Sequence, residues 1–252
     1  MNINSDINVL GSLSDFNLII SFLKENIKTS DNKVHEVQQV YSNIKTLKSF
    51  KRFKTAINNT LIKFYNPIVE SLICKVINTE GISSDSLLVL FWNASINNEL
   101  LNYLNQQVYF PAFYSGRVTI KTNEVVACLQ ELKRNEKSML KWSDSTVNTN
   151  ASKYLTLLKK FLIMKGRLNK TLERPYLNDK LLIIFVYLLL AIDSSSNLLE
   201  SKWLNYCFLE KEIFIQRIMQ KKFMKYFNLD YTGAKLKIET TVPYEEIYDK
   251  LK

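Results

Sequence analysis

Residues 141–170 decide the fold prediction, and they read KWSDSTVNTNASKYLTLLKKFLIMKGRLNK. The stretch joins a hydroxyl-rich turn, an amphipathic segment and a basic segment that contains a glycine. Its apolar side chains recur at helical spacing and predict one buried helix face, made of Val147, Ala151, Tyr154, Leu155, Leu158, Phe161 and Leu162. Two interpretations fit this pattern: a DNA-reading helix followed by a wing, or a surface helix with charged residues on its solvated side.

The segments around this stretch form an ordered series. RVTIKT (117–122) alternates and is β-branched, which predicts a short strand. NEVVACLQELKR (123–134) predicts a helix, EKSMLKW (136–142) a short second helix, and residues 163–177 a hairpin around LNKT. The order of helix, short helix, tight turn, longer helix and hairpin is typical of a winged helix-turn-helix, in which the third helix can enter the major groove.

The distribution of charge favours a polyanionic partner. The chain carries a net charge of +10 and has a sequence pI of about 9.3, which favours nucleic acid or an acidic membrane surface. A Lys-, Asn- and Ile-rich composition can also reflect an AT-rich genome, so total charge alone decides little. Between Lys121 and Lys180, however, thirteen basic and six acidic residues give +7 of the +10. This concentration favours an electrostatic contact in that segment.

The rest of the chain is predicted to be mainly α-helical. Only 5 Gly and 4 Pro interrupt a chain of 252 residues that is 46% hydrophobic, and so few breakers favour long helices. We expect a helical bundle over 1–113, including helices near 15–27 and 32–43 and a basic amphipathic helix between 46 and 67. A winged helix-turn-helix-like portion follows over 114–190. Residues 191–252 are expected to give a helix, a β-hairpin and a terminal helix, packing on the rest.

The sequence contains few of the motifs and residues that are typical of enzymes. None of the patterns GxxxxGK[ST], GxGxxG, GxSxG and HExxH occurs. His35 is the sole histidine, and the three cysteines are far apart, as expected of buried thiols in a reducing cytosol. We therefore expect no enzyme, no metal and no cofactor, with a nuclease built from dispersed carboxylates as a distant alternative.

Membrane insertion is not expected from the sequence. The first residues show no signal peptide, and the longest apolar run, Leu181 to Ile192, is twelve residues. A membrane-spanning helix needs about 20 apolar residues. The run is better interpreted as a buried helix, and the protein as cytoplasmic.

The candidate binding residues fall in three groups. Small polar residues begin the predicted third helix and suit contact with bases or phosphates: Ser145, Thr146, Asn148, Thr149 and Ser152. Basic residues continue that helix and the hairpin: Lys153, Lys159, Lys160, Lys165, Arg167 and Lys170. A second basic group, on the helix between 46 and 67, contains Lys48, Lys51 and Arg52. This group fits a helix along a phosphate backbone, or a core helix whose solvated face is basic. Asp144, as an N-cap, would bind backbone amides.

Four segments in order carry a family resemblance. They are LKSFKRFKTAINNTLIKF (47–64), LLVLFWNASINNELLNYL (87–104), KWSDSTVNTNASKYLTLLKKFLIMKG (141–166) and YTGAKLKIETTVPYEEIYDKL (231–251). The chain resembles the BrxA family of BREX phage-defence systems, from about Val40 onward. The third segment is similar to a Trp-Ser-x-Ser-Thr turn that leads into a helix, so Ser143, Ser145 and Thr146 correspond to the turn and recognition region. The chain departs from the family in its Lys/Asn-rich composition and in the lead from Met1 to Lys33.

The resemblance implies a small, mostly helical, non-enzymatic protein that binds double-stranded DNA. It also implies a NusB-like helical portion joined to a winged-helix portion. We expect an accessory defence protein that contacts DNA mainly through phosphates, with other BREX components as a further class of partner. The main alternative is a protein-interaction adaptor within the defence complex, since winged helices can also bind protein.

Overall fold

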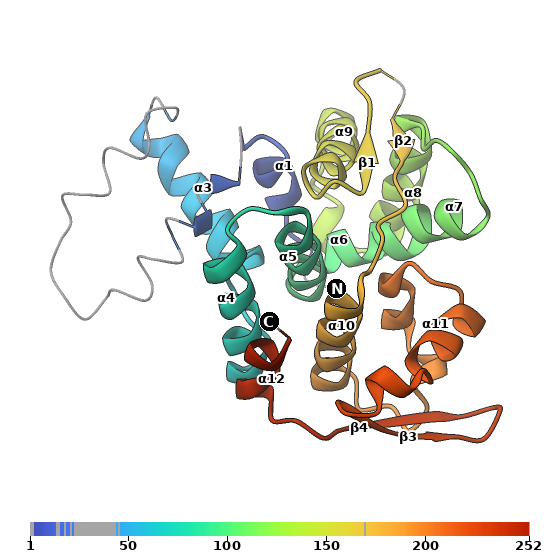
Figure 1. Ribbon diagram of the computed structural model, residues 1–252. Coiled ribbons are helices and arrows are strands. Elements are labelled where there is room, and N and C mark those ends of the chain that lie inside the picture. Colours follow the sequence, from blue (N-terminus) through green and yellow to red (C-terminus); the bar gives the residue numbers. More distant parts are fainter. Residues whose placement is uncertain are drawn as a thin grey trace, which may run out of the picture. The chain divides into compact units, whose positions relative to one another are not determined.

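The computed structural model describes residues 3–13, 16–17, 19–20, 22, 44, 46–168 and 170–251 (Figure 1). The predicted helix over 32–43 and His35 lie outside the described residues, as does most of the predicted helix over 15–27. What the structure describes is mainly helical, with a small hairpin near the C-terminus. The predicted fold class, mainly α, is therefore confirmed.

The chain divides into two compact units. Unit 1 comprises residues 1–63 and 80–173, and unit 2 comprises residues 64–79 and 174–252. Because α4 (Pro67–Glu80) belongs almost entirely to unit 2, the chain leaves unit 1, returns to it at residue 80 and leaves it again at residue 174. The division into 1–113, 114–190 and 191–252 stays a prediction.

The first half of unit 1 is built around a buried helix. Its described elements are α1 (Asp6–Leu10), α3 (Leu47–Thr60), α5 (Ser84–Asn97), α6 (Glu99–Leu104), the π-helix η2 (Asn105–Tyr109) and α7 (Phe110–Tyr114). Residues 86–95 of α5 are all buried. Ser83 caps this helix by accepting from the Ser86 backbone N–H at 3.1 Å.

The helical path also continues through Pro111. From the sequence, Pro111 is expected to end the helix that precedes it, because proline breaks helices, but η2 leads directly into α7, and Pro111 lies in the first turn of α7. A proline is tolerated there because its missing N–H has no helical partner to lose.

The second half of unit 1 contains residues 141–166, the segment with the hydroxyl-rich turn and the amphipathic helix. Its elements are α8 (Thr122–Asn135), the 3-10 helix η3 (Lys137–Met139), α9 (Asp144–Lys160), β1 (Met164–Lys165) and β2 (Thr171–Leu172). The strand predicted for RVTIKT is reduced to an antiparallel bridge between Thr119 and Thr171. Two backbone hydrogen bonds flank it, from Leu172 N to Val118 O at 2.8 Å and from Ile120 N to Lys170 O at 3.3 Å. The three short extended segments therefore have the order 118–120, β2, β1.

Unit 2 contains a helix, α10, whose central residues are all buried. Besides α4, its elements are α10 (Asp179–Ile192), the 3-10 helices η4 (Leu198–Glu200) and η5 (Lys202–Cys207), α11 (Lys211–Ile218), the 3-10 helix η6 (Lys221–Phe223), β3 (Phe227–Tyr231), β4 (Leu236–Thr240) and α12 (Tyr244–Lys250). All residues from Leu181 to Leu189 are buried, as the apolar run predicted. Searched over the described residues, the structure has no helix of the length and hydropathy needed to cross a membrane.

The single helix expected before the C-terminal hairpin, through Trp203, Phe208 and Ile218, is divided into separate elements. Phe208 has a φ of 55°, which ends η5, and α11 starts three residues later. The predicted C-terminal hairpin is confirmed, with Phe227 paired to Thr240 and Tyr231 to Leu236.

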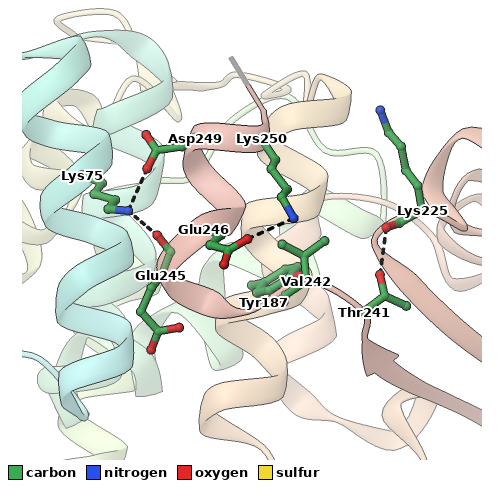
Figure 2. Close-up of polar contacts among 9 residues, drawn as sticks. All are labelled: Lys75, Tyr187, Lys225, Thr241, Val242, Glu245, Glu246, Asp249 and Lys250. Atoms are coloured by element: carbon green, nitrogen blue, oxygen red, sulfur yellow. Dashed lines mark hydrogen bonds and ion pairs between the residues drawn. The ribbon is translucent and has the colours of Figure 1, made fainter.

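The terminal helix α12 is held to α4 by a lysine (Figure 2). Lys75 Nζ lies 2.9 Å from Asp249 Oδ2 and also donates to the backbone carbonyl of Glu245. Just before α12, the Tyr187 hydroxyl donates to Val242 O at 2.8 Å. These contacts fasten the C-terminal segment within unit 2.

An acidic residue at the start of α10 has two cationic neighbours. Asp179 lies 2.5 Å from Lys222 Nζ and 3.4 Å from an Arg217 guanidinium nitrogen. The hydrogen bond and charge of Lys222, followed by those of Arg217, lower the pKa of Asp179 despite its partial burial.

Candidate nucleic-acid interface

The N-terminus of α9 is capped by a serine. Ser143 Oγ accepts from the Thr146 backbone N–H at 3.2 Å and lies 3.0 Å from the Thr146 hydroxyl. Asp144 is the first helical residue and is exposed, so it is not the cap. An exposed carboxylate at this position repels a phosphate that approaches the helix end.

The two sides of α9 differ sharply in burial. The buried side contains Val147, Asn150, Ala151, Tyr154, Leu155, Leu157 and Leu158. The opposite side is exposed or half-exposed and consists of small polar residues, namely Ser145, Asn148, Thr149, Ser152 and Thr156. At 100° per residue these five positions lie within one third of the helix circumference. The central part of the outer face thus has no charge and no bulky side chain.

Two helices flank α9, and one of them is α1 (Figure 1). α8 packs along α9, and α1 packs between α3 and α9, touching both. A Cβ placed on Gly11, just after α1, would lie 2.5 Å from the Lys153 carbonyl oxygen and 2.9 Å from its Cβ. The backbone at Gly11 therefore lies very close to α9. Lys153 is half-buried at this contact and lies at the edge of the outer face, not at its centre.

Two predicted basic residues lie at the C-terminal end of α9 and in the hairpin. Burial lowers the pKa of Lys170, and the positive charge of Lys159 lowers it further. The two predicted residues thus contribute positive charge to the same region of unit 1. Lys160 follows Lys159 and is half-exposed.

The hairpin contributes one paired and one exposed cation. Lys165 Nζ lies 2.7 Å from Glu173 Oε1, with 70% of the lysine side chain and 34% of the glutamate side chain exposed. Arg167, beyond Gly166, is exposed. The register pairs Lys165 with Thr171, and the Glu173 Oε1 atom that Lys165 approaches is itself buried.

The second basic group lies on α3. Lys48, Lys51 and Arg52 are all exposed. Burial raises the pKa of the Asp6 carboxyl in α1, and the positive charge of Arg52 partly offsets this rise. Because α1 lies between α3 and α9, the structure separates this group from the α9 surface.

Positive charge is unevenly shared between the two units. The sequence ranges of unit 1 contain 21 Lys and Arg against 13 Asp and Glu, a net +8, whereas unit 2 contains 13 against 11, a net +2. The electrostatic field that attracts a polyanion is therefore strongest around unit 1.

Sequence analysis missed the buried contacts that fix the rotation of α9. The Tyr154 hydroxyl donates to Asn105 Oδ1 at 2.9 Å, and Asn105 Nδ2 donates to Ser95 Oγ at 3.1 Å. Tyr154 and Asn105 are buried completely. No local sequence pattern links residues 49 positions apart, although an asparagine between two apolar helical segments is itself a signal of a buried polar contact. Within the described ranges, no three His, Cys, Asp or Glu side chains form a group able to hold a metal ion.

Together, fold and surface define a mainly helical protein that presents a helix with a small polar face and a basic hairpin beside it. Comparison with protein families gives a match to the family model BrxA over residues 12–185. The chain belongs to the BrxA family, and is thus a BREX-associated protein of a family not known for enzymes. The match begins earlier than the resemblance, and it ends before the tail segment 231–251. No curated protein and no solved structure matches the chain.

Proposed function

We propose that the protein binds double-stranded DNA as a non-enzymatic accessory component of a BREX-type anti-phage defence system in the cytoplasm. The observation that carries the proposal is the surface formed by the outer face of α9 and the β1–β2 hairpin. There, small uncharged side chains on α9 are followed by Lys159 near its C-terminal end and by Lys170 in the hairpin. We call this surface, with Lys160, Lys165 and Arg167, the α9–hairpin surface.

The order of elements supports a winged helix-turn-helix. In that motif one helix supports a second, and the second enters the major groove while a hairpin contacts the DNA alongside it. α8, the η3 turn and α9 suit the first two parts, and β1–β2, joined to residues 118–120, suits the wing. The NusB-like character of the remaining helices stays a prediction.

The side chains of the surface suit contact with a duplex. The small residues on the outer face of α9 leave room for a groove to approach the helix backbone, and their hydroxyl and amide groups can bond bases or phosphates. Asn148 already donates to the Asp144 carbonyl at 2.8 Å, and Thr156 donates to the Ser152 carbonyl at 2.9 Å. With these groups engaged, cations dominate the surface, and we expect mainly phosphate contacts and low sequence specificity.

The salt dependence of affinity tests this proposal. We assign one phosphate each to four candidate cations of this surface, namely Lys159, Lys160, Arg167 and Lys170. If each neutralises one phosphate, log affinity falls against log salt with a slope of about −3.6, at about −0.9 per contact. Fluorescence anisotropy of a labelled duplex, titrated at several salt concentrations, measures the slope. Absence of binding at low salt, or binding independent of salt, refutes the proposal.

Charge reversal locates the surface. Replacing Lys159, Lys160 and Arg167 together by Glu is expected to abolish binding while the helical circular dichroism signal stays unchanged. The matched control replaces three exposed lysines of unit 2 by Glu, an identical change of charge, at Lys211, Lys221 and Lys235. Equal affinity of the two variants contradicts this placement. In that case glutamates at Lys48, Lys51 and Arg52 test whether the α3 group binds DNA.

The adaptor alternative makes a different prediction. A protein that only joins defence components co-purifies with products of neighbouring genes and gives no DNA shift. Cleavage of plasmid DNA, tested with added divalent metal, separates the nuclease alternative from both.

A further inference from the structure

The tip of the β1–β2 hairpin exposes a large apolar side chain. Leu168 is 91% exposed, the highest value among the large apolar side chains of the described residues. A leucine this exposed contributes almost nothing to the folded core, because burial is what stabilises an apolar side chain. Isolated exposed leucines are common, so the position and surroundings of Leu168 must carry any functional argument.

The surroundings of this leucine are cationic. Gly166, with a φ of 91°, turns the chain out of β1, and the exposed Arg167 directly precedes Leu168. Residues 159–173 contain five basic residues and one acid. An apolar tip framed by cations matches a ligand with an anionic outside and an apolar inside. A DNA duplex has this character, since phosphates surround the stacked bases.

We propose that Leu168 is a wedge that enters the minor groove and partly opens one base step of the bound duplex. The inference rests on the proposed DNA-binding function and adds to it a deformation of the DNA. Leucine and similar side chains can insert between base steps, unstack them and kink the duplex, while adjacent Arg or Lys side chains contact the groove. Arg167 is placed to make the groove contact.

The wedge gives the protein a source of sequence preference without base hydrogen bonds. Pyrimidine–purine steps such as TA and CA unstack most readily. Binding that opens a step therefore favours duplexes with a TA or CA step at the hairpin position. The phosphate contacts of the α9–hairpin surface are indifferent to sequence and remain the same on every duplex.

The test compares two leucine variants. Leu168→Ala removes the tip, and Leu140→Ala, at a leucine of unit 1 that is 62% exposed and lies outside the hairpin, is the control. The probe is a short duplex with 2-aminopurine at a central TA step and a fluorophore pair at its ends. Wild type and Leu140→Ala are expected to raise 2-aminopurine fluorescence and shorten the end-to-end distance. Leu168→Ala is expected to lose both effects and to bind about fivefold more weakly, while Leu168→Met retains them.

The possible outcomes distinguish a failure of the wedge proposal from a failure of the proposed DNA-binding function. If Leu168→Ala unstacks and bends the duplex as wild type does, the wedge is overturned, and DNA binding by the lysines stands. If the Lys159, Lys160 and Arg167 glutamate variant binds DNA as wild type does, the DNA-binding surface itself fails. If Leu168→Ala binds DNA unchanged but loses a co-purifying defence component, the tip occupies a protein pocket, and the wedge is again overturned.

Discussion

Removal of one acid is expected to strengthen DNA binding. In Glu173→Gln the carboxylate that pairs with Lys165 at 2.7 Å becomes neutral. Lys165, whose side chain is 70% exposed, is then free to neutralise a phosphate. A gain of affinity is a stringent test, because misfolding of the variant or loss of a DNA contact can only lower the affinity.

The magnitude follows from counterion release. One additional phosphate contact adds about −0.9 to the slope of log affinity against log salt. If the variant and wild type bind equally at about 1 M salt, the variant therefore binds at most about eightfold more tightly than wild type at about 0.1 M salt. The Lys165 side chain is 70% exposed and the Glu173 side chain 34% exposed, so loss of the ion pair is expected to cost the fold about 1 kcal/mol. We therefore expect the affinity ratio of variant to wild type to approach 1 as salt rises.

The assay is an anisotropy titration of wild type, Glu173→Gln and a control at low and high salt. The control, Glu131→Gln, removes an exposed acid from α8 of the same unit, and so changes the net charge equally. An equal gain in both variants shows that only overall charge matters. An unchanged or reduced affinity of Glu173→Gln refutes the placement of Lys165 at the DNA.

Two further predictions concern the fold. Gly11→Ala places a methyl group 2.5 Å from the Lys153 carbonyl oxygen, so α1 must shift. We expect a loss of about 1–3 kcal/mol in the free energy of unfolding, measured by urea titration; an unchanged midpoint contradicts this close approach. The pKa of Asp179 is lower in the folded protein than in the unfolded chain, where it is about 4. The ion pairs of Asp179 therefore stabilise the fold above about pH 4, and this contribution is lost as pH falls through the folded-state pKa. Asp179→Asn is therefore expected to weaken the decline of melting temperature with acid pH, and an equally steep decline in the variant contradicts the assignment.

Local patterns predicted the elements of the α9 region well. The helical spacing of apolar residues indicated α8 and α9, and alternation in RVTIKT indicated an extended segment. These signals are local, because a helix or strand shows its own period along the chain. Predictions failed where a local signal competes with packing. Pro111 lies inside a continuing helical path, and Phe208 interrupts a predicted helix, because burial of the neighbouring apolar residues outweighs backbone preference.

The sequence by itself determined that the protein is mainly helical, that α9 has one apolar and one polar side, and that positive charge is concentrated around it. These properties depend on residue type and spacing alone. Tertiary structure decided which cations are available on that side. α1 packs beside Lys153, and Glu173 pairs with Lys165. Such contacts join residues distant in the chain, and they depend on how whole helices pack, which the periodicity of a single sequence does not encode.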